Sequence, residues 1–218
     1  DDYLPGLRAL CDEFGILLII DEVMTGFGRT GARFGVEHWG VRPDLLVSGK
    51  GLAGGYAAIC GVFATREVAA PIAEAGFDVM FHTFAALPSA CAAADKVLEI
   101  LTRENLVTRS AAMGERLAAR LHGLLDQHPH VAEVRGRGLL QAVEIVRDRD
   151  TLTPFEAADR ITNRIVGRGL AHDVFFYPGG TGAVRDIVCL GPALVSTEAE
   201  IDQMADVLAR TIDEVVAR

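Results

Sequence analysis

Hydrophobic residues recur at two alternating spacings along the first hundred positions. Residues 4–14 carry apolar side chains at helical spacing and end at Gly15, which predicts an amphipathic helix. Short apolar runs bounded by turn-forming residues predict buried strands, at 16–23, 45–48 and 58–65. An alanine-rich segment over 88–101 predicts a further helix. Helices alternating with buried strands indicate an α/β fold with a mainly parallel sheet.

The pattern changes near residue 104. A long amphipathic helix is expected over 106–127, followed by two loosely alternating segments that are typical of an antiparallel sheet, 131–135 and 139–146. The rest of the chain predicts, in order, a helix over 157–168 ended by Gly169, a glycine-rich loop over 176–185, a strand over 187–190 and a helix over 197–218 with Thr197 and Glu200 as its capping box. We therefore expect a partial large α/β domain at residues 1–104 and a smaller α+β domain at 105–218.

Composition narrows the class of protein. Half of the 218 residues are hydrophobic, which is typical of a folded chain. The 30 acidic residues outnumber the 21 basic ones, for a net charge of −9, so neither nucleic acid nor an anionic membrane is an expected partner. No apolar run approaches the ~20 residues that span a bilayer, and no targeting segment is recognisable, which favours a cytoplasmic chain. The four cysteines form no CxxC pair, and no metal site is expected.

Two residues of complementary chemistry follow two predicted strands. Asp21 lies at the end of the first apolar run, and Lys50 follows the second in a glycine-flanked turn. In open α/β sheets, ligands bind beyond the carboxyl ends of the strands, so the carboxylate and the amine are expected to face one crevice. This pair suits pyridoxal phosphate, which needs a lysine for its aldehyde and an anion at its pyridine nitrogen.

Longer motifs surround both residues. Residues 18–31 read LIIDEVMTGFGRTG, and residues 43–55 read PDLLVSGKGLAGG. These segments resemble the signature and the lysine segment of class III (ω-type) aminotransferases, and the similarity extends over essentially the whole chain. The resemblance implies a pyridoxal-phosphate-dependent transferase of the aspartate aminotransferase-like type (fold type I). It begins near the middle of the family pattern, which implies that the chain is about the carboxyl-terminal half.

The resemblance also implies roles for individual residues. Lys50 matches the lysine that forms the Schiff base with the cofactor and moves the proton, and Asp21 matches the partner of the pyridine nitrogen. Val23 matches the apolar residue that packs on the cofactor ring. Thr83 matches a threonine that binds the cofactor phosphate of the neighbouring subunit, which implies a homodimer with shared sites. The family's phosphate-binding helix start and its ring-stacking aromatic residue lie upstream of the matched segments.

The expected reaction moves an amino group between an amine or ω-amino acid and a keto acid such as pyruvate. Relatives often bind the substrate carboxylate with an arginine of the smaller domain, and Arg185 is the weak candidate for that role, with a solvated loop residue as the alternative.

Two other interpretations remain open at this point. The chain could be a non-catalytic remnant or a split-gene subunit of the same fold. Alternatively, residues 26–31 satisfy GxGxxG after a strand, which would indicate a dinucleotide-binding oxidoreductase. The acidic Asp21 and Glu22 argue against that site, because they precede the glycines and would repel a pyrophosphate.

Overall fold

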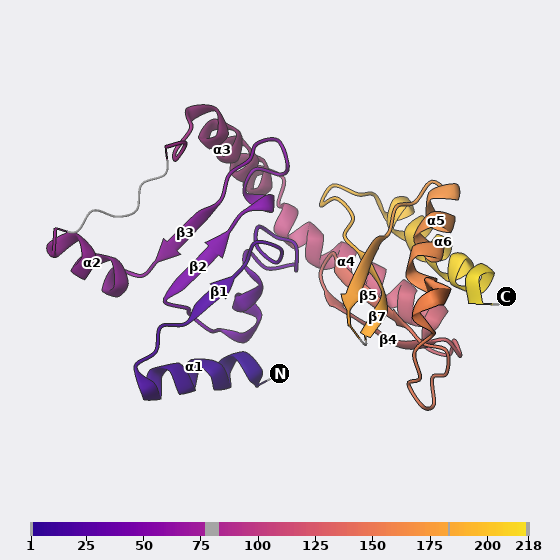
Figure 1. Cartoon of the computed structure of the whole chain (residues 1–218). Helices are drawn as coiled ribbons and strands as arrows, with labels where there is room; N and C mark the ends of the chain where they lie inside the picture. The colour runs from indigo at the N-terminus through magenta and orange to yellow at the C-terminus, as the bar shows by residue number, and fades with distance from the viewer. Residues whose placement is uncertain (1, 77–82, 183, 217–218) are drawn as a thin grey trace. The chain divides into compact units, whose positions relative to one another are not determined.

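The computed structural model describes residues 2–76, 83–182 and 184–216. The chain divides into two compact units, Asp1–Thr108 and Arg109–Arg218 (Figure 1). Among the helices that the structure describes, none combines the length and the apolar character needed to cross a membrane.

The first unit contains one small sheet and the helical segments around it. Its elements are α1 (Tyr3–Phe14), β1 (Ile19–Asp21), the 3₁₀ helix η1 (Gly35–Trp39), β2 (Leu45–Ser48), the 3₁₀ helix η2 (Lys50–Leu52), β3 (Gly61–Ala64), α2 (Arg66–Glu74) and α3 (Pro88–Arg103). Helix α1 ends as predicted at Gly15, which adopts the left-handed conformation (φ +64°) that glycine tolerates best. Helix α2 has no counterpart in the sequence prediction.

The sheet of this unit is mixed, with the strand order β1-β2-β3. Strands β1 and β2 are parallel, whereas β3 is antiparallel to β2. The fold class is therefore α/β as predicted, although only one of the two strand pairs seen here is parallel. Strand β1 is also shorter than the predicted run over 16–23, because only three of its residues form ladder pairs with β2.

The apolar runs of this sheet are less buried than their sequence suggests. Val62 and Phe63 of β3 are 62% and 52% exposed, and Ile19 of β1 is 58% exposed. The expectation that these strands are buried on both faces is wrong for this chain. An apolar run indicates that a strand is suited to burial, but the helices or strands that bury it must come from other parts of the fold.

The second unit packs helices on an antiparallel sheet. Its elements are α4 (Leu106–Leu125, which begins in the first unit), β4 (Val131–Arg137), β5 (Leu140–Ile145), the 3₁₀ helix η3 (Ala157–Asp159), α5 (Ile161–Ala171), β6 (Tyr177–Thr181), β7 (Val184–Leu190) and α6 (Glu198–Val216). The strand order is β4-β5-β7-β6, and all three pairings are antiparallel. The antiparallel arrangement was predicted for the segments that form β4 and β5. A core of leucine, isoleucine and valine side chains lies between the sheet and the helices.

Two predictions for this unit are wrong. The segment 176–185 is not a loop, because Tyr177–Thr181 pairs with β7 as an edge strand despite its proline and glycines. The helix predicted over 157–168 also differs at both ends, because α5 begins at Ile161, after the separate 3₁₀ helix η3, and continues past Gly169 to Ala171. A Cβ at Gly169 would lie 2.6 Å from the ring of Phe176, so this glycine permits close packing rather than ending the helix.

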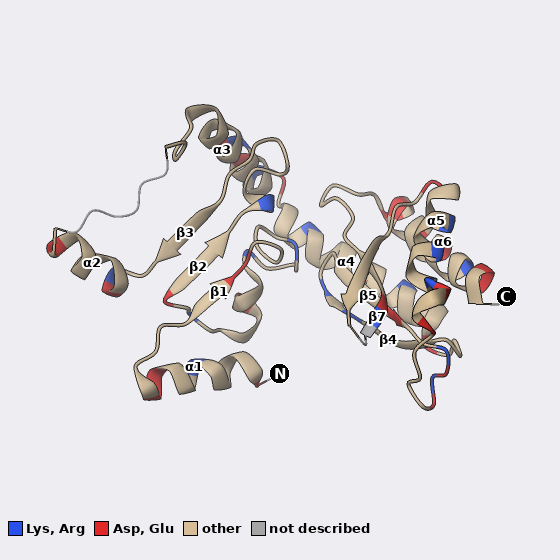
Figure 2. Cartoon of the chain, viewed as in Figure 1, with Lys and Arg blue, Asp and Glu red and all other residues tan. Residues whose placement is uncertain are grey.

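The terminal helix α6 is capped and paired as its sequence suggests. Thr197 donates its backbone N–H to Glu200 Oε2 at 2.7 Å, and the N–H of Glu200 donates to Thr197 Oγ1 at 3.3 Å, which confirms the capping box. Arg116 of α4 binds both carboxylate oxygens of Asp202 at 2.9 and 2.6 Å. Figure 2 shows basic and acidic segments interspersed along these helices, which reflects such cross-helix pairs.

Candidate active site

The ends of β1 and β2 bring Asp21 and Lys50 to one edge of the sheet. Asp21 is the last residue of β1 and pairs with Val47, and Lys50 begins η2 two residues after β2 ends. Because the strands are parallel, their carboxyl ends meet at the same edge. Both side chains are exposed. Both residues thus follow the carboxyl ends of adjacent parallel strands, as predicted.

The backbone at Lys50 is constrained. Lys50 has φ +38°, in a region that residues with a Cβ rarely occupy. The preceding Ser48 is fully buried and donates its hydroxyl to the carbonyl oxygen of Gly61 at 3.2 Å. After the turn, the N–H of Leu52 donates to the carbonyl oxygen of Gly49 at 2.9 Å. The lysine therefore projects from a tight turn that is fixed on both sides.

The turn that follows β1 is anchored by a buried carboxylate. Glu22 is 1% exposed, and its oxygens accept hydrogen bonds from the N–H groups of Gly35 (2.9 Å) and Val36 (2.6 Å) and from the hydroxyl of Thr25. In the sequence, Glu22 is recognisable only as a charge that would repel a phosphate. Its one local signal is an acid at the end of an apolar run, and burial of that acid became visible only in the fold.

The turns after β1 and β2 pack directly against each other. A Cβ at Gly49 would lie 3.6 Å from Cγ1 of Val23, so the Val23 side chain covers the backbone beside Lys50. A Cβ at Gly51 would lie 3.1 Å from Cβ of Phe27 and 3.5 Å from the carbonyl oxygen of Gly26, which leaves little room for a side chain. Lys50 lies between these two glycines in the chain, and its amine contacts the sulfur of Met24.

Helix α3 supports the lysine turn from another side. Leu52 and Ala53 form a small buried cluster with Ala94 of α3. Thr83 lies in the exposed turn that precedes this helix, and its neighbours over 77–82 are outside the described residues. The threonine thus belongs to the segment leading into the helix that packs on η2.

Arg185 belongs to the second unit and has a backbone partner there. Its guanidinium donates to the carbonyl oxygen of Phe155 at 2.7 Å, while its Nε is buried without a hydrogen-bond partner among the described residues. The next residue, Asp186, is 8% exposed and lies within 3.4 Å of the Thr162 hydroxyl. Burial raises the pKa of the Asp186 carboxyl, although the charge of Arg185 opposes that effect.

The glycine-rich segment after β1 does not have the geometry of a dinucleotide site. Residues 23–30, all of them described, form successive turns, and the first helical segment after them is the short 3₁₀ helix Gly35–Trp39. A dinucleotide fingerprint places its glycines at the start of an α-helix, whose terminus binds the pyrophosphate. The structure therefore does not favour this alternative.

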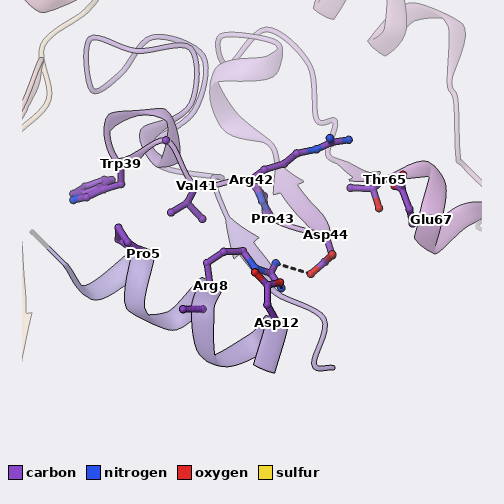
Figure 3. Close-up of a pocket in the computed structure, with 12 residues that line it drawn as sticks. Pro5, Arg8, Asp12, Trp39, Val41, Arg42, Pro43, Asp44, Thr65 and Glu67 are labelled. Atoms are coloured by element: carbon purple, nitrogen blue, oxygen red, sulfur yellow. Dashed lines mark hydrogen bonds and ion pairs between the residues drawn. The ribbon is translucent and has the colours of Figure 1, made fainter. Parts of the chain in front are cut away.

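A pocket of about 590 Å³ lies at the opposite edge of the sheet, between α1 and the start of β2 (Figure 3). Arg8 of α1 donates to Asp44 at 2.7 Å, and the same carboxylate accepts the N–H of Leu18 at 2.7 Å. This pairing with Arg8 holds the pKa of Asp44 below its usual value. The polar groups of the pocket thus join α1 to the sheet, far along β2 from the turn that carries Lys50.

Comparison with known proteins gives a consistent result. The family model described as aminotransferase class-III matches residues 1–212. The chain is 38% identical to an uncharacterized aminotransferase of Schizosaccharomyces pombe, over 99% of this chain and 48% of that protein. It is 39% identical to a taurine–pyruvate aminotransferase of Bilophila wadsworthia, over 93% of this chain and 45% of that one.

A solved structure extends the similarity to the fold. A transaminase from the marine bacterium Virgibacillus superposes with a TM-score of 0.94 at 32% identity, over 99% of this chain and 49% of that one. The chain thus spans about half the length of the relatives that it matches.

Proposed function

The chain belongs to the class III aminotransferase family, and on that premise we propose that it carries the lysine part of a pyridoxal-phosphate site. The reaction proposed is transfer of an amino group between an amine or ω-amino acid and a keto acid. The name of the taurine–pyruvate relative supports an ω-amino donor and pyruvate as the acceptor. The observation that carries the proposal is the meeting of Asp21 and Lys50 at the carboxyl ends of two parallel strands.

The residues at this edge fit the ring end of the cofactor. Within the described part of the chain, neither Asp21 nor Lys50 is engaged in an ion pair, so the anion and the amine are both available to a ligand. The Val23 side chain packs against Gly49 beside Lys50 and offers an apolar surface, which suits an aromatic ring. When bound, pyridoxal phosphate supplies an aldehyde for amine exchange and an aromatic ring that accepts electron density.

Each residue then has a separate task. Lys50 would hold the cofactor through its amine, and the same amine would hold and return the proton that is moved at the substrate carbon. Asp21 would provide the negative charge that favours the protonated ring nitrogen. Its Oδ1 already accepts the N–H of Val23 at 2.9 Å, which orients the carboxylate on the turn.

Two further assignments belong to the proposal. Thr83, exposed before α3, would bind a cofactor phosphate with its hydroxyl, and we assign it to the site of a second copy in a homodimer. Arg185 stays the candidate for the substrate carboxylate, although its present bond to the Phe155 carbonyl would have to be exchanged for that contact. The rest of the phosphate site would come from the half of the family's length that this chain does not span.

The chain's two lysines provide the test, since Lys96 is a natural control that is paired with Glu99 on α3. The protein, assembled with an amino-terminal half of the family where that is required for solubility, is incubated with pyridoxal 5′-phosphate, reduced with borohydride and mapped by mass spectrometry. We expect the phosphopyridoxyl group on Lys50 and little on Lys96.

Equal labelling of the two lysines, or labelling of Lys96 alone, would contradict the assignment of Lys50. Labelling of Lys50 together with an absence of amino transfer to pyruvate would instead support the non-catalytic subunit.

A further inference from the structure

Among the described residues, the Lys50 amine has one hydrogen-bond partner, the sulfur of Met24. Met24 is 54% exposed and belongs to neither of the hydrophobic clusters of the chain. A methionine at a partly open edge of the sheet is not explained by core packing. The sulfur of Met24 therefore serves the amine rather than the core.

The contact follows from the way the two turns are fixed. Val23, next to Met24, packs on Gly49, and Phe27 packs on Gly51, so the two turns meet on both sides of Lys50. The ring of Phe27 is in turn 5.4 Å from that of Phe34 in an edge-to-face contact. Position 24 therefore faces position 50 as a consequence of the packing and independently of its own side chain.

A thioether treats an amine differently from an oxygen acceptor. Sulfur accepts hydrogen bonds weakly and carries no charge, so it contacts the amine with little preference for the ammonium form. Carboxylate oxygens bind the ammonium form preferentially, and the chain's other lysine, Lys96, has a carboxylate partner in Glu99. A lysine that acts as nucleophile and proton carrier must lose its proton readily.

We propose that Met24 is a positioning residue for Lys50: its sulfur holds the amine at the sheet edge without the charge-assisted hydrogen bond that an oxygen acceptor would make. This inference rests on the proposed function of Lys50. It predicts that the acceptor strength of side chain 24 sets the reactivity of this amine.

The charged residues on the elements that flank Lys50 are the same in any comparison at position 24. They are Asp21 at the end of β1, Glu22 and Arg29 on the facing turn, and Asp95, Lys96, Glu99 and Arg103 on α3, which packs on η2. The carboxylate of Glu22 is already bound by three donors, and Glu99 is paired with Lys96 and Arg103. Substitution at 24 thus changes one interaction of Lys50 in a constant electrostatic setting.

The test compares the assembled protein with Met24→Leu, Met24→Gln and Met24→Glu, side chains of similar length. Each is treated briefly with limiting acetic anhydride at neutral pH, and the ratio of acetylation at Lys50 to that at Lys96 is measured by mass spectrometry. We expect similar ratios for methionine and leucine, a lower ratio for glutamine, and for glutamate a ratio lower by about two- to fivefold, as an exposed ion pair allows.

Thermal melting identifies any variant that fails to fold.

A second measurement needs no substitution. In protein labelled with [¹³C]methyl methionine, fixing pyridoxal phosphate on Lys50 should shift the NMR signal of Met24. The signals of Met113 and Met204, which pack on the core, should stay in place. Equal acetylation ratios in all folded variants, or an unmoved Met24 signal, would overturn the inference. Because acetylation needs no cofactor, the acetylation ratios are independent of whether Lys50 binds pyridoxal phosphate, and the Met24 signal is compared only in protein whose Lys50 carries the fixed cofactor.

Discussion

Glu22 donates its backbone N–H to the carbonyl oxygen of Val47 at 2.8 Å, one residue beyond the last ladder pair of β1 and β2. The parallel pairing therefore continues to the buried carboxylate that anchors the following turn. The same turn supplies Val23 to the backbone beside Lys50. A residue with no expected chemical role thus connects the sheet to the position of the candidate lysine.

Replacing Glu22 by alanine should destabilise the first unit. The change leaves the N–H groups of Gly35 and Val36 and the hydroxyl of Thr25 without their acceptor. Each unsatisfied buried donor costs about 1–3 kcal/mol, and local relaxation recovers part of that, so we expect a loss of about 2–4 kcal/mol in the free energy of unfolding. Chemical denaturation measures it.

Glu37→Ala is the matched control. Glu37 also accepts two backbone N–H groups, those of Arg33 (3.0 Å) and Phe34 (3.4 Å), but it is exposed, and water can replace it. Its loss should cost no more than about 1 kcal/mol. A Glu22→Ala protein as stable as Glu37→Ala would show that the buried carboxylate does not hold the turn.

Asp21→Asn should impair chemistry more than folding. Asparagine keeps an oxygen for the N–H of Val23 but removes the charge that keeps the ring nitrogen protonated. We expect weaker cofactor binding and a fall in transamination of about 100-fold or more, in line with the loss of one partner of a charge pair inside a site. The exposed Asp150→Asn, in the second unit, controls for the general effect of removing a carboxylate. Turnover of Asp21→Asn close to that of Asp150→Asn would refute the role of Asp21.

Two glycines of α4 should respond to alanine in opposite directions. A Cβ at Gly114 would lie 2.3 Å from backbone atoms of Gly138, which cannot move aside easily, so Gly114→Ala should lower the melting temperature markedly. At Gly123 nothing lies within 4 Å, and alanine there should stabilise the helix by up to about 1 kcal/mol. Calorimetry on both variants decides this, and a stabilising Gly114→Ala would mean that the helix does not approach the β4–β5 turn so closely.

The stability contributed by Asp186 should depend on pH. Burial raises the pKa of this carboxyl in the folded chain, so the protonated form is favoured there. Its contribution is fully present below the pKa of the unfolded chain and is lost as the pH rises through the folded pKa. Asp186→Asn should therefore melt higher than the parent protein at pH 8, with the advantage shrinking toward pH 4.

Asp148, in the same unit, should stabilise the fold with the opposite pH dependence. Its pKa is lowered, mainly by the N–H of Thr151, which donates to it at 2.9 Å. Its stabilisation is present above the unfolded pKa and is lost as the pH falls. Asp148→Asn should therefore melt lower than the parent at pH 8 and approach it in acid. If both variants followed the same trend, the cause would lie outside these two carboxyls.

The sequence predicted an element well where a few adjacent residues determine it. This is true of the end of α1 at Gly15, the capping box at Thr197 and the extent of β2. The edge strand Tyr177–Thr181 was not predicted, because its glycines and proline disfavour a strand locally, and its pairing with β7 overrides that preference. The same division holds at the candidate site: Asp21 and Lys50 were found from strand ends and motifs, whereas the anchoring by Glu22 depends on burial that no neighbouring residue reveals.

The sheet of the first unit exposes apolar side chains at both of its outer strands. Both outer strands of the sheet, β1 and β3, have one strand partner each among the described residues, and Ile16, Leu17, Val62 and Phe63 are each more than half exposed. Such edges and faces favour association between chains. The chain also spans about half the length of its relatives.

We therefore expect the 218-residue chain, produced alone, to be weakly soluble, to hold pyridoxal phosphate poorly and to transaminate negligibly. The cofactor phosphate carries a charge near −2 and needs several donors, of which Thr83 is proposed to supply one side chain. Co-expression with the amino-terminal half of a class III aminotransferase, joined or separate, should yield soluble protein that binds the cofactor, whereas an unrelated protein of equal size should not. Light scattering and cofactor absorbance measure both effects. A monodisperse preparation of the chain alone, with stoichiometric cofactor and measurable turnover, would show that it needs no such half.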